Sequence, residues 1–532
     1  MTGAGADGEP TQQAGNTRLS VVLAAAMFVL VVDTSLMNVS ISAVVKDLDT
    51  TVSSVQSAIA LEALVSAAFI LISSKVGDLV GRKRAYVAGL LAYAIGALAM
   101  TVAQSLTAII VFWALIGGLG ASLLLPAMQS LIHGNFEGAA QKKTYALIGA
   151  AAAIAAAVGP LLGGFVTTYL SWRVGFLFEA VVIAVVLSQI GLLKDVPYTG
   201  ARQVDTIGAV LSVVGMGGVV LGILVWQEGG DYVVLLIAIG ALALWALARW
   251  LERRHREGKV TLLDPDLFRL PHFRIGISGQ TLQNITLGGA MIALPIFLQI
   301  KLEYDALQTG LAIAPLSLTM FAVAILAGRK SGGARPAKVI RNGFALSTLG
   351  IALIIPIVPR ADSGWYLLIP LVIAGAGLGL LVSQLNNYTL APIDDERISE
   401  AAGVNSAAGS FGLSFGLAVA GGILLATLAL AFTNLSNASP VIPSSQQQQI
   451  AQTLEDDAQV VSNTQLDELL ADEPPAVREE ILSINTEATN LALQVALLVP
   501  ILASLLGLFN SLRMMRLPDV EPQASAEAAA LA

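Results

Sequence analysis

The chain has 532 residues, of which 55% are hydrophobic and only 12% are charged. Soluble domains usually carry about 25% charged residues, so this composition excludes an ordinary soluble protein and indicates a chain that lies in a lipid bilayer. The sequence has no cysteine, and its three histidines stand far apart at His133, His255 and His272. A disulfide framework, a cysteine nucleophile and a histidine-based metal site are therefore not expected.

Residues 1–18 are polar and carry one base, Arg18, so they lack the basic start and cleavage site of a signal peptide. Long apolar runs follow along the chain. A helix needs about 20 mostly apolar residues to cross the hydrocarbon core of a bilayer. By that rule the sequence predicts fourteen spans, at residues 19–45, 55–76, 84–104, 107–132, 144–169, 174–194, 205–226, 232–250, 275–300, 308–328, 341–358, 364–388, 400–432 and 490–512.

The basic residues test this division of the chain. If the loop after the second span faces the cytoplasm, all but five of the 29 Lys and Arg residues fall on the cytoplasmic side. Cytoplasmic loops of membrane proteins are enriched in Lys and Arg, and omitting one span would destroy the pattern. We therefore predict fourteen spans with both termini in the cytoplasm. The five exceptions are Lys46, Arg173, Lys301, Arg360 and Arg478.

Residues 433–489 are too polar for lipid, because they contain several prolines, a Gln446–Gln449 tract and acidic clusters. We predict an acidic extracytoplasmic loop with one or two short amphipathic helices. Its role stays open between a cap or spacer and a part in substrate handling or partner docking. The last residues, 513–532, are predicted to form a cytoplasmic tail that is disordered from Pro518.

A charged run, Gly77-Asp78-Leu79-Val80-Gly81-Arg82-Lys83-Arg84, separates the second and third spans. Charges are costly in lipid, so this run is predicted to be a water-facing turn. Gly81 permits a tight turn, and Asp78 can pair with bases at neighbouring helix ends. With the fourteen spans, the run resembles the Gly-x-x-x-Asp-x-x-Gly-Arg-Lys/Arg signature of the major facilitator superfamily, in its fourteen-helix drug:proton antiporter branch. Ser74 replaces the first glycine.

This resemblance implies an all-α membrane protein with the major facilitator fold, in which two six-helix bundles are joined by two extra central helices. The N-terminal bundle would comprise residues 19–194, the extra helices 195–250, a cytoplasmic linker 251–274 and the C-terminal bundle 275–512. The chain would be a multi-pass protein of the bacterial plasma membrane. The signature turn, with Asp78, Gly81, Arg82 and Lys83, would form a gating loop.

A second motif lies in the fifth span, which contains Gly159-Pro160-Leu161-Leu162-Gly163-Gly164. It resembles the antiporter signature Gly-Pro-x-x-Gly-Gly of the same family. Small residues such as Gly159, Gly163 and Gly164 allow helices to approach closely, and Pro160 allows a bend. The motif suits a helix that rocks against a partner, and close packing without motion is the alternative.

Two acids, Asp33 and Glu62, are the candidates for proton coupling. An ionisable group deep in a membrane is costly and indicates a function, and a carboxyl group withdrawn from water can exchange a proton near neutral pH. Residues 33–38 also resemble the branch's Asp-x-Thr-x-x-Asn pattern, with Ser35 for threonine. If their helices are adjacent, the two carboxyls would titrate as a pair. Hydrogen-bonded structural carboxyls are the alternative. Glu179, near the outer end of the sixth span, is interpreted as interfacial.

The fourth span departs from the family pattern. Where the family usually carries Arg-x-x-Gln-Gly-x-Gly, this chain has Ala114 for the arginine and Gly117 for the glutamine, and it keeps Gly118 and Gly120. Proton coupling here would depend on the acids alone or differ in detail. Gly409 similarly occupies a position where the branch often has an arginine.

Amide side chains inside the spans predict a partly polar central cavity, because each must find a hydrogen-bond partner or water. Interhelical hydrogen bonding is the alternative for each of them. The candidates for the cavity or for substrate contact are Asn38, Gln280, Gln283, Asn284, Gln384, Asn387 and Asn405.

The favoured function is secondary active export, with amphiphilic compounds or drugs moved outward against an inward proton flow by alternating access. Its partners would be protons, a small-molecule substrate and the bilayer. No Gly-x-x-x-x-Gly-Lys-Ser/Thr loop is present, so neither nucleotide-driven pumping nor a cofactor is expected, and no metal or nucleic acid either. Export of a metabolite, lipid or envelope precursor is the first alternative, and a non-transporting sensor on the same fold is the second. An enzyme is not expected.

Overall fold

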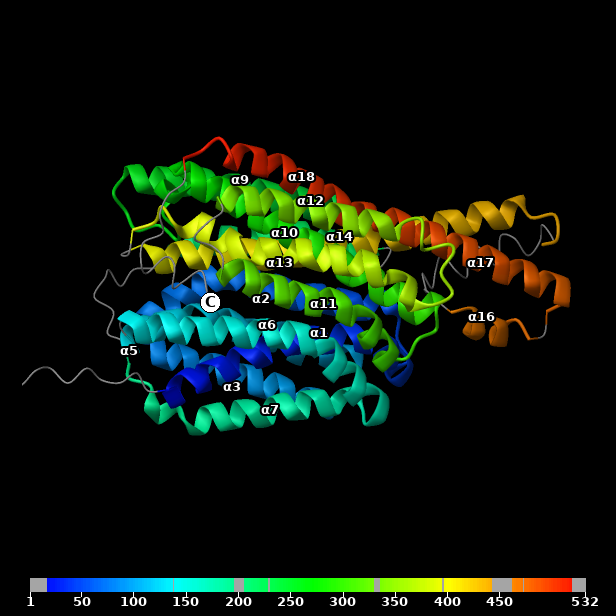
Figure 1. Cartoon of the computed structure of the whole chain (residues 1–532), viewed down its shortest axis with the longest axis horizontal. Coiled ribbons are helices and arrows are strands. Elements are labelled where there is room, and N and C mark those ends of the chain that lie inside the picture. Colours follow the sequence, from blue (N-terminus) through cyan, green and yellow to red (C-terminus); the bar gives the residue numbers. More distant parts are fainter. Residues whose placement is uncertain are drawn as a thin grey trace, which may run out of the picture.

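The structure is a computed structural model that describes residues 17–136, 138–195, 205–227, 230–329, 335–394, 397–442, 462–471 and 473–518. It is a bundle of long helices that run roughly along one common axis (Figure 1). The predicted tails at 1–18 and 513–532 lie mostly outside the described residues, and in the predicted loop at 433–489 residues 443–461 and 472 lie outside them.

The helices of the N-terminal half are α1 (Thr17–Leu48), α2 (Val52–Val80), α3 (Arg82–Met100), the joined run α4 (Leu106–Ala108), η1 (Ile109–Gly117) and α5 (Gly118–Asn135), then α6 (Gly138–Tyr169), α7 (Trp172–Ser188) and η2 (Ile190–Leu192). The next two are α8 (Thr206–Gln227) and α9 (Val233–Arg256). The C-terminal half contains η3 (Pro265–Arg269), α10 (Pro271–Ile296), η4 (Phe297–Lys301), α11 (Ala306–Arg329), α12 (Pro336–Ile354), η5 (Gly364–Leu367), α13 (Leu368–Leu390), α14 (Ile398–Ala438), α16 (Asn463–Leu469), α17 (Pro475–Ala496) and α18 (Leu498–Met514).

Thirteen of the described helices are long and apolar enough to cross a membrane. The remaining predicted span corresponds to α3, which has 19 residues and begins with the three bases of the signature turn. It packs against α5, η1 and α7. The all-α fold with fourteen spans is therefore confirmed. Aromatic side chains at one end of the bundle, including Tyr169, Tyr232 and Trp365, are largely exposed, as in the belts that mark a membrane interface.

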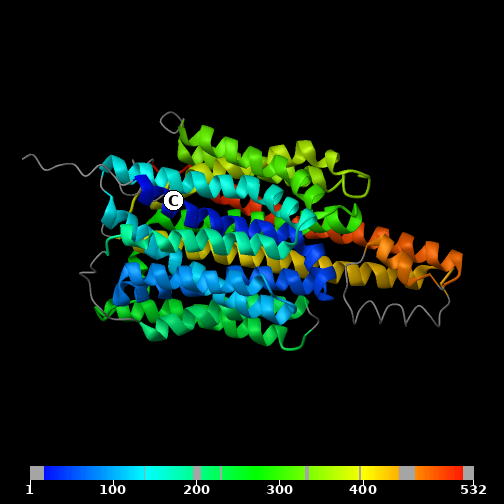
Figure 2. The same ribbon diagram turned by 90° about the horizontal axis from the view of Figure 1, so that it is seen from below.

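The two ends of the bundle differ in chemistry. We call the end that carries the signature turn and the linker between α9 and α10 the basic end. Figure 1 shows that α1 begins and α18 ends there. We call the opposite end the extension end, because part of α14, α16 and much of α17 project beyond the bundle there (Figures 1 and 2).

The two halves meet along two long seams, α6 against α11 and α2 against α14. The extra helices α8 and α9 pack on each other along one edge of the bundle, and α8 also contacts α2 and α14 (Figure 2). Although these helices are central in the sequence, they are peripheral in the fold. At the basic end the buried Asp205 begins α8 and accepts hydrogen bonds from Gly208 N and Trp250 Nε1, so it ties α8 to α9.

The extension replaces much of the predicted loop with helix. The 41-residue α14 is about 60 Å long, roughly twice the thickness of the hydrocarbon core. The returning helix α17 begins at Pro475, fifteen residues before the predicted span, and packs on α14. Its buried residues Val477, Ile481, Ile484 and Ala488 recur at helical spacing. An amphipathic helix of this kind is too polar for the rule that identified the spans.

A polar contact docks the extension on the bundle. Thr464 in α16 donates through its backbone N–H to Glu303 Oε1 at 2.9 Å and through its hydroxyl to Oε2 at 2.6 Å. Within the extension, Arg478 donates to both oxygens of Asp467. These bonds hold the pKa of Asp467 below its ordinary value.

Thr464→Val is expected to loosen this docking, because the hydroxyl bond to Glu303 is lost. A bond of this kind contributes about 1 kcal/mol, so amides of α16 should exchange with deuterium about fivefold faster. The control is Thr101→Val, which removes a local hydroxyl bond at the same end of the bundle. Equal exchange of α16 in both variants would show that Glu303 does not hold the extension.

Candidate functional site

Asp33 lies in the interior of the N-terminal half and is only 1% exposed. Tyr93 of α3 donates its hydroxyl hydrogen to Asp33 Oδ2. Trp113 of η1 places its indole Nε1 2.9 Å from both carboxylate oxygens. The aspartate is thus held by donors from two other helices, and no arginine takes part in these bonds.

The donor from the fourth span depends on an unusual helix. Residues Ile109–Gly117 form a π-helix, which is rare and frequently marks a functional site. Trp113 is in the middle of this segment, directly before the Ala114 that stands in the place of the family's usual arginine. Its ring also packs edge-on against Phe176 of α7, with centroids 6.4 Å apart. This chain thus has Ala114 where the family usually has an arginine. The residue directly before it, Trp113, supplies an uncharged hydrogen-bond donor to Asp33.

Two further acids lie close to Asp33. Glu62 of α2 is 9% exposed and Glu179 of α7 is fully buried, and charge interactions link each of them to Asp33. Neither carboxylate oxygen of Glu179 has a hydrogen-bond partner among the described residues. The interpretation of Glu179 as interfacial was wrong, because α7 turns this side chain inward toward α1 and α3.

Trp113→Phe is expected to reduce proton-coupled transport about tenfold, because it keeps the ring but removes the hydrogen that holds Asp33. Hydrogen bonds to a charged group contribute about 1.5–3 kcal/mol, and tenfold corresponds to the lower end of that range. The measurement is dye efflux in inverted vesicles. Trp245→Phe, on a ring 58% exposed on α9, is the control. Equal rates in the two variants would contradict a positioning role for Trp113.

A polar cavity of about 230 Å³ lies between the halves, in the part of the bundle nearest the basic end. Its wall reaches Leu390, the last residue of α13. Of the predicted cavity residues, Gln280, Asn284 and Asn405 line it. Asn386, one of the amides inside the spans that predicted a cavity, also lines it, and the remaining polar residues in its wall were not predicted: Gln129, Ser406 and Ser410.

A second, much smaller cavity, of about 20 Å³, lies nearer the extension end between α1 and α6 on one side and α10 and α11 on the other. Its wall is mostly apolar and includes Leu287, Met291 and Pro160. Asn38, a predicted cavity residue, and Ser35 are also in its lining, but the surface that they present to it is apolar. Three other predicted residues line neither cavity: Gln283, Gln384 and Asn387.

Beyond the second cavity, hydrogen bonds join the two halves. Gln299 of η4 accepts from Ser42 N at 2.9 Å and donates to Val39 O at 3.1 Å. The Thr168 hydroxyl oxygen accepts from Leu307 N at 3.1 Å. These contacts close the bundle at the extension end.

The signature turn makes its contacts within the N-terminal half. Gly81 has a φ of 108°, which only glycine adopts readily. Asp78 pairs with Arg82 one turn along, at 3.3 Å. Lys83 donates its backbone N–H to Asp195 Oδ1 at 3.1 Å and its ammonium to Leu193 O at 2.6 Å. The turn therefore ties the α2–α3 connection to the end of the sixth span.

The motif in α6 faces two helices at once. A Cβ atom added to Gly159 would stand 2.6 Å from Ser35 Cβ, and one added to Gly163 would stand 2.8 Å from Leu36 Cα, both on α1. On the other side, a Cβ at Gly164 would meet Ala306 O at 2.5 Å, and one at Gly310 of α11 would meet Pro160 O at 2.2 Å. Only glycine permits these approaches, so the motif lies at the contact between the halves.

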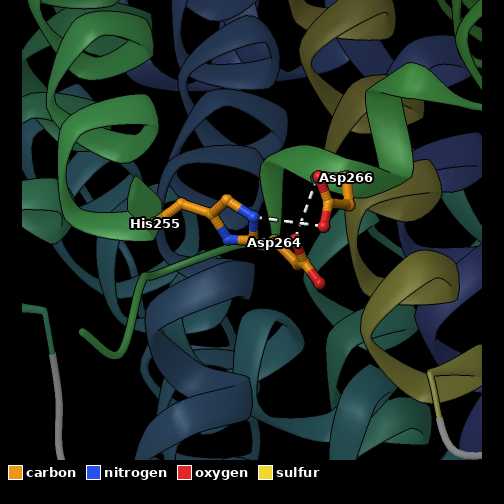
Figure 3. Close-up of side chains that lie close together, drawn as sticks. All are labelled: His255, Asp264 and Asp266. Atoms are coloured by element: carbon orange, nitrogen blue, oxygen red, sulfur yellow. Dashed lines mark hydrogen bonds and ion pairs between the residues drawn. The ribbon is translucent and has the colours of Figure 1, made fainter. Parts of the chain in front are cut away.

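At the basic end, His255, Asp264 and Asp266 lie together (Figure 3). Their ligand atoms are within 4.8 Å of one another, as a metal site would require. However, Arg397 pairs with Asp264 at 2.5 Å, and Arg269 pairs with Asp266 at 2.7 Å. Because both carboxylates already have a cation, the cluster fits an ion-pair network that ties the linker to the start of α14.

These features define a polytopic helical membrane protein whose two halves enclose cavities and whose N-terminal half buries three carboxyl groups. The sequence model of the Major Facilitator Superfamily matches residues 23–417. The chain belongs to this superfamily, whose members are transporters.

Curated relatives lie in the same family. The chain is 30% identical over 411 residues to the puromycin resistance protein pur8 of Streptomyces alboniger, covering 75% of this chain and 80% of that one. It is 26% identical over 420 residues to the probable actinorhodin transporter of Streptomyces coelicolor, covering 77% and 72%. It is 25% identical over 425 residues to the multidrug export protein EmrB of Escherichia coli, covering 76% and 80%.

A solved structure supports the fold. The crystal structure of the human organic anion transporter MFSD10 is similar with a TM-score of 0.52 and 14% sequence identity, covering 77% of this chain and 94% of that one. Identity at this level bears on the fold alone.

Proposed function

We propose that the protein is a proton-coupled antiporter that exports drugs or other amphiphilic small molecules across the bacterial plasma membrane. The observation that carries this proposal is Asp33, a buried carboxyl whose hydrogen-bond donors are uncharged. Without a fixed cation to neutralise it, such a carboxyl can alternate between charged and protonated forms during a cycle. The names of the relatives, which include resistance and multidrug export proteins, support the same function.

The orientation is part of the proposal. The basic end faces the cytoplasm, because its loops carry most of the Lys and Arg residues. The polar cavity is then near the cytoplasm, and the seal formed by Gln299 lies on the outer side. This arrangement is the inward-facing stage of alternating access, in which substrate enters from the cytoplasm. The gating role of Asp78, Gly81, Arg82 and Lys83 remains a prediction, which their contacts with the end of the sixth span support.

The test is transport by purified protein in liposomes under an imposed pH gradient, with a panel of neutral and cationic dyes, antibiotics and lipids as cargo. We expect flux that requires the gradient and stops when a protonophore collapses it. Flux that ignores the gradient would remove proton coupling and leave a facilitator. Binding without flux under every gradient would favour a sensor.

A second candidate is export of a lipid or envelope precursor, which the extension favours. The helices α14 and α17 carry protein surface well beyond the membrane at the outer end, where a released amphiphile would meet the envelope. Analysis of the medium and envelope lipids of a deletion strain, beside its drug susceptibility, distinguishes the two candidates.

A further inference from the structure

One face of α10 contributes to both cavities. Gln280 and Asn284 line the polar cavity, and Leu287 and Met291 line the apolar one. Their spacing of four, three and four residues places all of them on one stripe of the helix. The stripe is about 16 Å long at 1.5 Å per residue. It is polar toward the basic end and apolar toward the seal, so the polar cavity is the part of this face with room for a ligand head.

No described residue in either wall carries a charge. The polar wall is made of carboxamides and hydroxyls, and Gly409 contributes no side chain where a base would otherwise fill the space. A Cβ at Gly409 would stand 3.3 Å from Asn284 Nδ2 and 3.4 Å from Gln280 Nε2. A cation would find no carboxylate here and an anion would find no base. The walls therefore suit a ligand without formal charge.

One buried oxygen atom in the polar wall has no hydrogen-bond donor. Asn405 donates to Asn386 Oδ1 at 2.6 Å, and its own Oδ1 has no partner among the described residues. The Asn405 side chain is only 5% exposed. A buried acceptor without a donor is costly, so a ligand that fits this wall offers hydroxyl or N–H groups.

We propose that the transported substrate is an uncharged amphiphile whose polar head donates hydrogen bonds and binds in the polar cavity. This inference rests on the proposed function as an exporter, and it specifies the substrate class. It predicts that an amphiphile with a neutral, hydroxylated or amide-bearing head binds more tightly than a cationic or anionic amphiphile of the same length.

The test is equilibrium binding to the full chain in lipid nanodiscs, followed by tryptophan fluorescence. Four probes share a decyl tail: 1-O-decylglycerol, its di-O-methyl ether, decyltrimethylammonium and decyl sulfate. We expect the glycerol ether to bind at least tenfold tighter than each of the other three. Equal or tighter binding of the dimethyl ether would refute the donor requirement. Preference for either ion, or no binding of the glycerol ether, would refute the neutral class.

A variant locates the effect in the cavity. Asn405→Asp is expected to increase the affinity for decyltrimethylammonium at least tenfold, because it places a carboxylate in the polar wall. The same change at Asn342, which is exposed on α12, is the control and should leave all four affinities unchanged. If Asn405→Asp does not fold, Ser410→Asp tests the same wall. Unchanged selectivity in the folded variant would place the head outside this cavity.

Binding without a gradient and flux with a gradient report on different proposals. Selective binding without proton-driven flux would retain the substrate class and remove the antiport mechanism. Proton-driven flux of dyes without preference for the glycerol ether would retain the antiport mechanism and remove the proposed substrate class.

Discussion

Asp33→Asn is expected to reduce proton-driven efflux to the level of empty liposomes while the protein still folds and binds substrate. The amide has nearly the shape of the acid, and its oxygen can still accept from Trp113 while its NH2 group donates to the Tyr93 hydroxyl oxygen, so the packing among α1, α3 and η1 is preserved. It cannot bind or release a proton, however, and the cycle loses its coupling ion. Exchange of substrate down its own gradient should persist.

The measurement compares uptake into inverted vesicles with and without a pH gradient, beside substrate binding to the purified variant. Asp49→Asn is the matched control, because Asp49 is exposed at the end of the same helix and its φ of 48° suits asparagine. Efflux at the parental rate in Asp33→Asn would remove Asp33 from proton coupling and leave Glu62 and Glu179 as the remaining acids of the site.

Gly310→Ala is expected to shift the protein away from the conformation described here. The added Cβ would lie 2.2 Å from the Pro160 carbonyl oxygen, so α6 and α11 must separate. Overpacking at such a contact costs ~3 kcal/mol, which changes the balance between conformations about 100-fold. Because this contact closes the extension end, that end should open and transport should fall.

The absence of native cysteine makes a direct measurement possible. Ser42 lies in the outer seal, bonded to Gln299, and Ser42→Cys would be the only thiol in the chain. A membrane-impermeant maleimide should label it slowly in the parent and much faster beside Gly310→Ala. Gly403→Ala is the control, since a Cβ there meets no atom within 4 Å. Slow labelling in both would contradict the proposed seal.

The sequence predicted the elements of this fold well, because apolar runs and basic loops are local signals. It identified Asp33, the glycines of α6 and three residues of the polar cavity for the same reason. It could not identify Tyr93 or Trp113 as partners of Asp33, because those contacts join three helices far apart in the chain. The sequence did show an acid, Glu179, inside the apolar run around Phe176. It could not show that this side chain points into the bundle, because that depends on how α7 packs against its neighbours.

The extension shows a different limit of prediction from sequence. A hydropathy rule detects helices that meet lipid on their surface, whereas α17 meets water on one face and α14 on the other. Its buried positions recur at helical spacing, so periodicity rather than mean hydropathy is the informative property there. The same distinction explains why the predicted fourteenth span began at residue 490 while the helix begins at Pro475.

The unbroken course of α14 has a mechanical consequence. Since one helix forms both a seam of the transport core and the stem of the extension, a tilt of the C-terminal half must swing the tip of that stem outside the membrane. The extension thus works as a lever arm, with its displacement growing with distance from the pivot. A fluorescent pair placed on this tip and on the outer end of α7 would report each turnover from the aqueous side.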